Sequence, residues 1–174
     1  MTIYHMLWER VPIDFSNEDW LEKCSMELDQ GYDYGIYQMY GDHPVYGDDV
    51  LLYIGKARDQ QFKNRLKQHR QDSNNITRYT RIHVGRLAEV DAGTYEAWGD
   101  AIDDIEGLLI ESHRPALNKQ NTSPPQAPDN PEEHFTVLNW DEYGSLSAEV
   151  STLRFTDYYE NEDEFAFELL SEDE

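Results

Sequence analysis

Residues 34–70 read YGIYQMYGDHPVYGDDVLLYIGKARDQQFKNRLKQHR, and the predicted core of the protein is built on this stretch. Residues 35–40 are rich in Tyr and Ile and alternate in part, which predicts a β-strand. Residues 50–54 are a short apolar run that predicts a second strand, and the Gly, Asp and Pro residues between the two runs are typical of turns. The two strands are therefore expected to form an antiparallel hairpin.

A helix is predicted from Gln60 to Gln71, directly after this hairpin. Phe62 and Leu66 are four residues apart and share one face of it. Arg65 and His69 have the same spacing and share a neighbouring face. The stretch therefore brings strand tyrosines close to an Arg and a His on a helix.

Further elements are predicted on both sides of this stretch. Residues 77–87 alternate between two faces and predict a third strand, and an apolar stripe at 3.6-residue spacing predicts a helix from 94 to 113. The N-terminal part predicts a short strand at 3–8 and a helix at 16–28 that braces the sheet. Strand-like runs at 135–140 and 150–155 could form a hairpin or add to the main sheet.

These patterns predict an α+β fold with a small central three-stranded antiparallel sheet flanked by helices. An N-terminal helical brace and a C-terminal β-hairpin with an acidic extension are expected to complete it. The expected divisions are 1–33 for the brace, 34–120 for the core, 121–133 for a Pro-rich linker, and 134–174 for the hairpin and acidic tail.

Glu106 has an unusual setting on the predicted helix. Its neighbours one turn away are Ile102, Leu109 and Ile110, which is not where a solvating carboxylate is expected. It is either a partly buried ion-pair partner or a ligand for a hard cation. Three other acids of this helix are interpreted as solvated, namely Asp103, Asp104 and Glu111. His83 is interpreted as a surface or groove residue and not as a metal ligand.

The chain resembles the GIY-YIG nuclease superfamily over roughly residues 34–120. The triplets Gly35-Ile36-Tyr37 and Tyr53-Ile54-Gly55 are present unaltered, and either alone would be a weak signal. The order is the strong signal: both triplets are followed by Arg65 with His69, then Glu106, Pro115 and Asn118. The spacing of the later residues resembles the restriction-endonuclease branch most closely.

The resemblance implies a DNA endonuclease that hydrolyses phosphodiester bonds with a single divalent cation, Mg²⁺ or Mn²⁺, held by Glu106. Tyr37 would be the general base, and Arg65 would contact the scissile phosphate. A tyrosine with a pKa near ~10 is a poor base, so it needs neighbours that orient or polarise it. The implied candidates are Tyr53, Lys56 and His69, while Asn118 would position Tyr37 or the phosphate.

The charge distribution is uneven. The net charge is −22, which by itself argues against binding a polyanion such as DNA. Residues 56–86, however, hold nine basic and two acidic residues, a net +7, so the rest of the chain carries −29. The basic residues gather where the resemblance places the DNA face. The residues expected to contact DNA are Arg58, Lys63, Lys67, Arg70, Arg78 and Arg81.

The acidic remainder has three readings that the sequence leaves open. It could be an adaptation to high salt, a tail that competes with DNA for the basic face, or a tail that binds a protein partner. Residues 157–174 hold nine acids and no Lys or Arg, interleaved with aromatic and aliphatic side chains. Pure disorder usually lacks such aromatic residues, so we expect this tail to dock on the body or on a partner.

The remaining composition predicts a cytoplasmic protein. The single cysteine, Cys24, fits a reducing compartment, and neither a signal peptide nor a membrane span is expected. A restriction-like enzyme would need a homodimer to cut both strands. The alternative to a nuclease is a catalytically silent binding or regulatory protein on a GIY-YIG fold, whose acidic tail engages a partner or masks the DNA groove.

Overall fold

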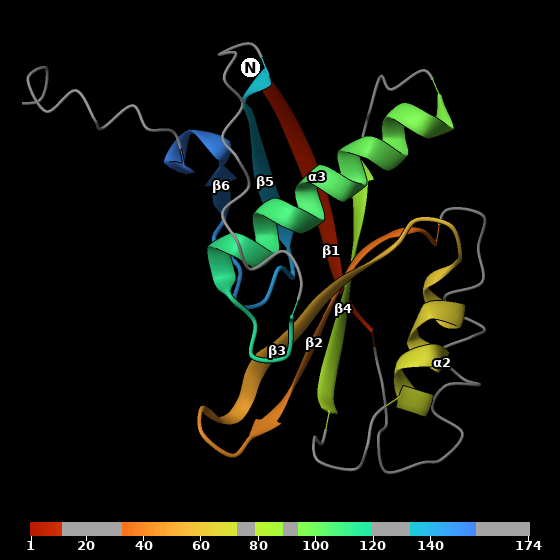
Figure 1. Ribbon diagram of the computed structural model, residues 1–174, viewed down its shortest axis with the longest axis vertical. Coiled ribbons are helices and arrows are strands. Elements are labelled where there is room, and N and C mark those ends of the chain that lie inside the picture. Colours follow the sequence, from red (N-terminus) through yellow and green to blue (C-terminus); the bar gives the residue numbers. More distant parts are fainter. Residues whose placement is uncertain (12–32, 73–78, 89–93, 120–132, 156–174) are drawn as a thin grey trace, which may run out of the picture.

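The computed structural model describes residues 1–11, 33–72, 79–88, 94–119 and 133–155. Its centre is a six-stranded sheet with the strand order β3-β2-β4-β1-β5-β6 (Figure 1). Neighbouring strands are antiparallel except for the parallel pair β1 and β5. The strands are β1 (Thr2–Val11), β2 (Gly35–His43), β3 (Gly47–Ala57), β4 (Tyr79–Ala88), β5 (Phe135–Asp141) and β6 (Glu149–Ser151).

Two helices lie among the described residues, α2 (Phe62–Asp72) and α3 (Tyr95–His113), and a 3₁₀ turn (Thr152–Phe155) follows β6. The predicted hairpin is confirmed as β2 and β3, and the predicted helices at 60–71 and 94–113 are confirmed as α2 and α3. The run at 150–155 is a strand only as far as Ser151. The predicted helix at 16–28, residues 121–132 of the predicted linker and the acidic tail lie outside the described residues.

The expected fold class was wrong. A three-stranded sheet flanked by helices is replaced by a curled, mixed six-stranded sheet with two helices in the described part of the chain. The reason is that β4 offers an open edge, and β1 pairs with it over seven residues from His5 to Val11. β5 then pairs with β1, so the N-terminal and C-terminal strands extend the core sheet.

The two helices cover opposite faces of the sheet. Ile102, Ile105 and Leu109 of α3 pack on a cluster that includes Ile36 and Ile54. On the other face, Phe62 and Leu66 of α2 pack with the strand residues Tyr37, Met39, Ile82 and Val84. Successive residues of β2 therefore belong to different cores, as the alternation of a strand requires. Buried side chains continue on both faces of β2 because each face has its own helix.

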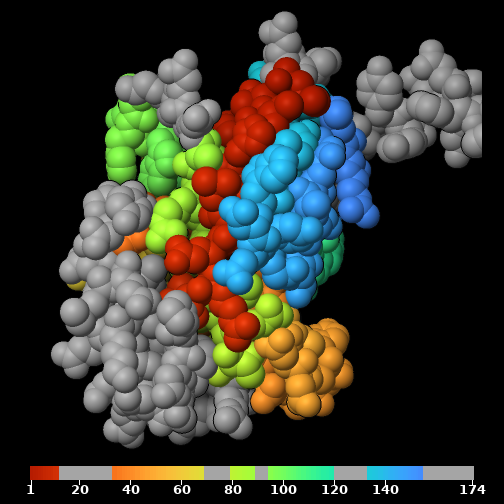
Figure 2. Space-filling view, turned by 180° about the vertical axis from the view of Figure 1, so that it is seen from behind, coloured from red at the N-terminus to blue at the C-terminus, as the bar shows by residue number. Residues whose placement is uncertain are grey.

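The face turned away from α3 is bare at β1 and β5. Figure 2 shows these two strands side by side at the surface. Ile3, Leu7 and Trp140 are about half exposed there, and Trp140 stacks on His5 with ring centroids 6.0 Å apart. No helix among the described residues is both long enough and apolar enough to cross a membrane.

Candidate active site

The two namesake tyrosines stand side by side on adjacent strands. Tyr37 of β2 and Tyr53 of β3 have ring centroids 6.1 Å apart with an interplanar angle of 30°. Tyr37 is fully buried, whereas Tyr53 is half-buried. Both side chains lie on the face covered by α2.

Gly55 makes room for this pair. It lies opposite Tyr37 in the ladder of β2 and β3. A Cβ atom at residue 55 would stand 2.4 Å from the Tyr37 hydroxyl oxygen and 2.6 Å from a Tyr53 ring carbon. The Tyr37 hydroxyl therefore passes directly over the backbone of β3, the outermost strand of the sheet, and glycine is the residue that permits this approach.

Arg65 brings a fixed positive charge to the tyrosines. It belongs to α2, which Phe62 and Leu66 anchor to the sheet through buried side chains. The guanidinium donates hydrogen bonds to both Tyr37 and Tyr53. Burial works against the charge of Arg65, but attraction and hydrogen bonding to the two tyrosines outweigh it, and the pKa of Arg65 is raised.

The electrostatics of Tyr37 connect it to residues from both faces. Burial is the main cause of a pKa well above the usual range, and Tyr53 and the negative charge of Glu106 raise it further. The charge and hydrogen bond of Arg65 lower the pKa. The charge of Glu106 thus acts on Tyr37, although α3 and α2 cover opposite faces of the sheet.

Glu106 is almost completely buried, with 7% of its surface exposed. Its Oε2 atom lies 2.8 Å from Nζ of Lys56, a residue of β3 that follows Gly55. Burial alone would lower the pKa of Lys56, but the hydrogen bond and charge of Glu106 raise it, with a further contribution from Asp103. The ion-pair alternative for Glu106 is therefore realised in this structure.

Asn118 fixes the edge of β3 beside the site. Its Oδ1 accepts from the Ile54 amide at 2.9 Å, and its Nδ2 donates to the Ile54 carbonyl at 2.8 Å. The neighbouring amide of Leu117 donates to Leu52 O at 2.8 Å, so residues 117–118 extend the ladder along β3. The predicted contact of Asn118 with Tyr37 or a phosphate stays a prediction.

The predicted DNA-contacting residues fall into three groups. Lys63 and Lys67 lie one turn apart on α2, where Lys67 is exposed. Arg58 and Arg81 are held by carboxylates of the protein, Arg58 by Asp103 and Asp100 and Arg81 by Asp49. Arg78 and the side chain of Arg70 lie outside the described residues, as does the side chain of His69, which was predicted to orient or polarise Tyr37.

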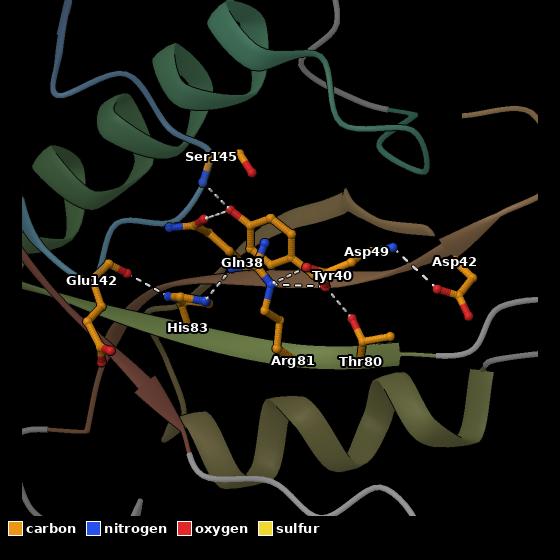
Figure 3. Close-up of polar contacts among 9 residues, drawn as sticks. All are labelled: Gln38, Tyr40, Asp42, Asp49, Thr80, Arg81, His83, Glu142 and Ser145. Carbon is orange, nitrogen blue, oxygen red and sulfur yellow. Dashed lines mark hydrogen bonds and ion pairs between the residues drawn. The ribbon is translucent and has the colours of Figure 1, made fainter. Parts of the chain in front are cut away.

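A polar cluster that sequence reasoning missed lies on the face of β2 and β4 opposite Tyr37. Figure 3 shows Arg81 beside the Tyr40 ring, with the guanidinium carbon 3.7 Å from the ring centroid. The Tyr40 hydroxyl donates to Gln38 Oε1 at 2.6 Å and accepts from the Ser145 amide at 2.7 Å. The cluster therefore ties the loop between β5 and β6 to the core strands.

His83 belongs to this cluster, and its prediction as a surface or groove residue was wrong. It is 3% exposed, and its Nδ1 lies 2.5 Å from the Glu142 carbonyl oxygen. Burial lowers the pKa of His83. The partner is a backbone group 59 residues away, so no local pattern could have revealed it.

Two of the helix acids interpreted as solvated were also misplaced. Asp103 pairs with Lys56 and Arg58. Glu111 is 4% exposed and pairs with Arg114 at the end of α3. Asp104 is exposed, as expected. The helical spacing of Asp103 and Glu106, three residues apart, was the available signal that both face the same strand.

The proposed role of Glu106 as the single carboxylate ligand of a divalent cation stays a prediction. Within the described ranges, no three His, Cys, Asp or Glu side chains come together as a metal site. Mg²⁺ commonly binds through one or two carboxylates and keeps several waters, and Glu106 of α3 is the carboxylate that would hold it here. In this structure the Lys56 ammonium pairs with the Glu106 carboxylate, which such a cation would bind.

Comparison with known proteins gives one partial similarity. A segment of 68 residues is 34% identical to the UvrABC system protein C of Symbiobacterium thermophilum, covering 39% of this chain and 10% of that protein. No family model and no solved structure matches the chain. The match spans a tenth of the relative's length, and it supports a GIY-YIG nuclease relationship only at the family level.

Proposed function

We propose that this protein is a divalent-metal-dependent DNA endonuclease of the GIY-YIG type. The observation that supports the proposal is that Tyr37 and Tyr53 stack on adjacent strands, and that the charges of Arg65 and Glu106 both act on the pKa of Tyr37. These groups come from two strands and two helices, and the packing of an apolar core would not by itself require these polar side chains. The partial similarity to UvrABC system protein C supports the same class.

Tyr37 is the proposed general base for the attacking water. Its burial opposes loss of the proton, and within this site Arg65 is the group that favours the phenolate. A base matched to its task needs a pKa closer to the working pH, so Arg65 has two proposed roles. It stabilises the phenolate of Tyr37, and its planar fork of donors can contact the scissile phosphate. Tyr53 and His69 are proposed to orient Tyr37.

Glu106 is the proposed metal ligand and Lys56 its neighbour. A bound Mg²⁺ or Mn²⁺ would neutralise developing charge on the phosphate and on the leaving oxygen. Lys56 is proposed to keep a positive charge beside the reacting phosphate. Asn118 holds Ile54, which precedes Gly55, and thereby keeps the strand that carries both Tyr53 and Lys56 in register.

DNA is proposed to approach from the side of α2. Lys63 and Lys67 lie there one turn from each other on α2. Phosphate contacts by such lysines make binding depend on salt. Cutting both strands of a duplex requires two sites, so we propose that two copies act together on one duplex.

The test is plasmid cleavage with Mg²⁺ across a salt series, with wild type beside Glu106→Gln and Tyr37→Phe. Asp104→Asn is the matched control, because it removes an exposed charge from the same helix. Cleavage that is lost in Glu106→Gln and Tyr37→Phe but kept in Asp104→Asn would establish the nuclease. Discrete fragments would indicate sequence specificity, and nicks or smears would indicate its absence. No cleavage by folded wild type at any salt would favour the silent binding protein.

A further inference from the structure

Lys56 is shared between two carboxylates of α3. Its Nζ lies 2.8 Å from Glu106 Oε2 and 3.2 Å from Asp103 Oδ1. Asp103 and Glu106 are three residues apart, so they are neighbours on the helix surface and both face β3. The ammonium is therefore within ion-pair distance both of the proposed metal ligand and of a second acid to which the GIY-YIG pattern gives no role.

Asp103 is itself held in place. Its Oδ2 accepts from Nη1 of Arg58 at 2.5 Å, and Arg58 also pairs with Asp100 at 3.5 Å. The Arg58 guanidinium lies against α3 at Gly99, where a Cβ atom would stand 2.5 Å from its Nε. The Arg58 guanidinium thus lies along one turn of α3, from Gly99 to Asp103, and orients the Asp103 carboxylate.

We propose that Asp103 is a positioning residue that retains Lys56 when Glu106 releases it to a divalent cation. The inference rests on the proposed function, because it takes Glu106 to be the metal ligand. A cation on Glu106 would repel an ammonium only 2.8 Å from the same carboxylate. Asp103 offers that ammonium an existing partner on the same helix face, so Lys56 leaves Glu106 without losing its ion pair.

Two consequences follow from this arrangement. Before the cation binds, Lys56 neutralises a nearly buried carboxylate that would otherwise be costly to keep charged. After it binds, the Lys56 ammonium stays at the β3 edge, next to Gly55 and the tyrosines. Asp103 thereby lowers the cost of metal binding without being a ligand itself.

The test is a mutant cycle on metal affinity, read by titration calorimetry with Mg²⁺ or Mn²⁺ on the full chain without DNA. The proteins are wild type, Asp103→Asn, Lys56→Met and the double variant. Asp103→Asn is expected to weaken binding by about tenfold, because Lys56 then has only Glu106. Lys56→Met is expected to tighten it, since the competing ammonium is gone. In the Lys56→Met background, Asp103→Asn should change affinity by less than about threefold.

Asp100→Asn is the matched control, because it removes a carboxylate from Arg58 and leaves both partners of Lys56 in place. It should leave affinity within about twofold of wild type. If Asp103→Asn does not fold, Arg58→Gln takes its place. This variant frees the Asp103 carboxylate to rotate and should weaken binding only when Lys56 is present.

Equal losses from Asp103→Asn in both backgrounds would overturn the inference, because a direct ligand or a simple charge effect does not require Lys56. Such a result beside normal cleavage would leave the proposed function intact. A clear dependence on Lys56, with no DNA cleavage under any condition, would support the inference and reject the nuclease. Wild type that binds no divalent cation would overturn both.

Discussion

At the scale of single residues, Gly55 shows most directly why the motif needs its final glycine. The Tyr37 hydroxyl and the Tyr53 ring occupy the space that any other side chain would enter. Gly55, the third residue of the Tyr-Ile-Gly triplet, is therefore needed to leave space for the side chains of Tyr53 and Tyr37. A methyl group at residue 55 must displace one ring or move the two strands apart.

We predict that Gly55→Ala costs about 1–3 kcal/mol of stability through overpacking and abolishes cleavage by displacing Tyr37. Urea denaturation and plasmid cleavage measure the two effects. Gly107→Ala is the matched control, since a Cβ there meets nothing within 4 Å and lies in a helix interior. It should gain about 0.5–1 kcal/mol and cut normally. A Gly55→Ala protein with wild-type stability would contradict the close approach.

Burial of the Tyr37 phenol also predicts a loss of stability at alkaline pH. Its pKa in the folded protein is raised by desolvation, then by Tyr53, above the value of about 10 in an unfolded chain. Below pH ~10 both states keep the proton and stability is full. As the pH rises further, the unfolded state loses the proton first, so stability falls by up to about 1.4 kcal/mol per pH unit.

Tyr37→Phe should lose less stability than wild type as the pH is raised from about 9 to about 11. Urea denaturation at each pH provides the measurement. Tyr46→Phe is the control, because Tyr46 is 67% exposed at the hairpin tip and should follow wild type. Parallel curves for wild type and Tyr37→Phe would show that the phenol is not buried in the folded state.

At the scale of elements, the outer edge of β3 is completed by a segment that is not a strand. The side-chain amide of Asn118 forms hydrogen bonds with both the N–H and the C=O of Ile54, as a neighbouring strand would, and the Leu117 amide donates to the Leu52 carbonyl. Beyond Ile54 the edge carries Gly55 and Lys56, where the site groups gather. The segment after α3 therefore forms hydrogen bonds with β3 as far as Ile54, and the residues of the proposed site follow directly.

Asn118→Ala should destabilise the protein by about 1–3 kcal/mol, because it leaves the amide and carbonyl of Ile54 without these partners at a half-buried edge. Chemical denaturation measures the loss. Lys119→Ala, at the next and exposed residue, should stay within about 0.5 kcal/mol of wild type. Equal stabilities of the two variants would mean that Asn118 does not hold β3.

The elements themselves were largely predictable, but their assembly was not. Local periodicity located the β2–β3 hairpin and both described helices, because each pattern is contained within one element. The pairing of Thr2 with Phe135 joins residues that are 133 positions apart, and no local pattern encodes it. The same holds for the site. The order of the motifs indicated Tyr37 and Glu106, whereas the role of Asp103 could be inferred only from its ion pair with Lys56 in the folded protein.

At the scale of the whole molecule, the basic segment is less available to DNA than its charge indicates. In the described part of the chain, at least four of the basic residues between 56 and 86 pair with carboxylates, namely Lys56, Arg58, Arg81 and Arg86. Lys63 and Lys67 of α2 are the other described residues of the proposed DNA face. Because the rest of the chain carries a net charge of −29, the acidic residues elsewhere should limit DNA binding strongly.

The acidic tail gives the sharpest test of that balance. Deleting residues 157–174 removes nine acids and no base, so the net charge falls in magnitude from −22 to −13. We expect DNA affinity at low salt to rise by at least about threefold, because less negative charge repels the duplex. The gain should shrink as salt screens the tail.

A control with the tail kept but its acids changed to Asn and Gln should bind as tightly as the deletion if charge is the cause. If only the deletion binds more tightly, the tail covers the basic face through its aromatic residues, and unchanged affinity in both would remove the tail from DNA binding altogether.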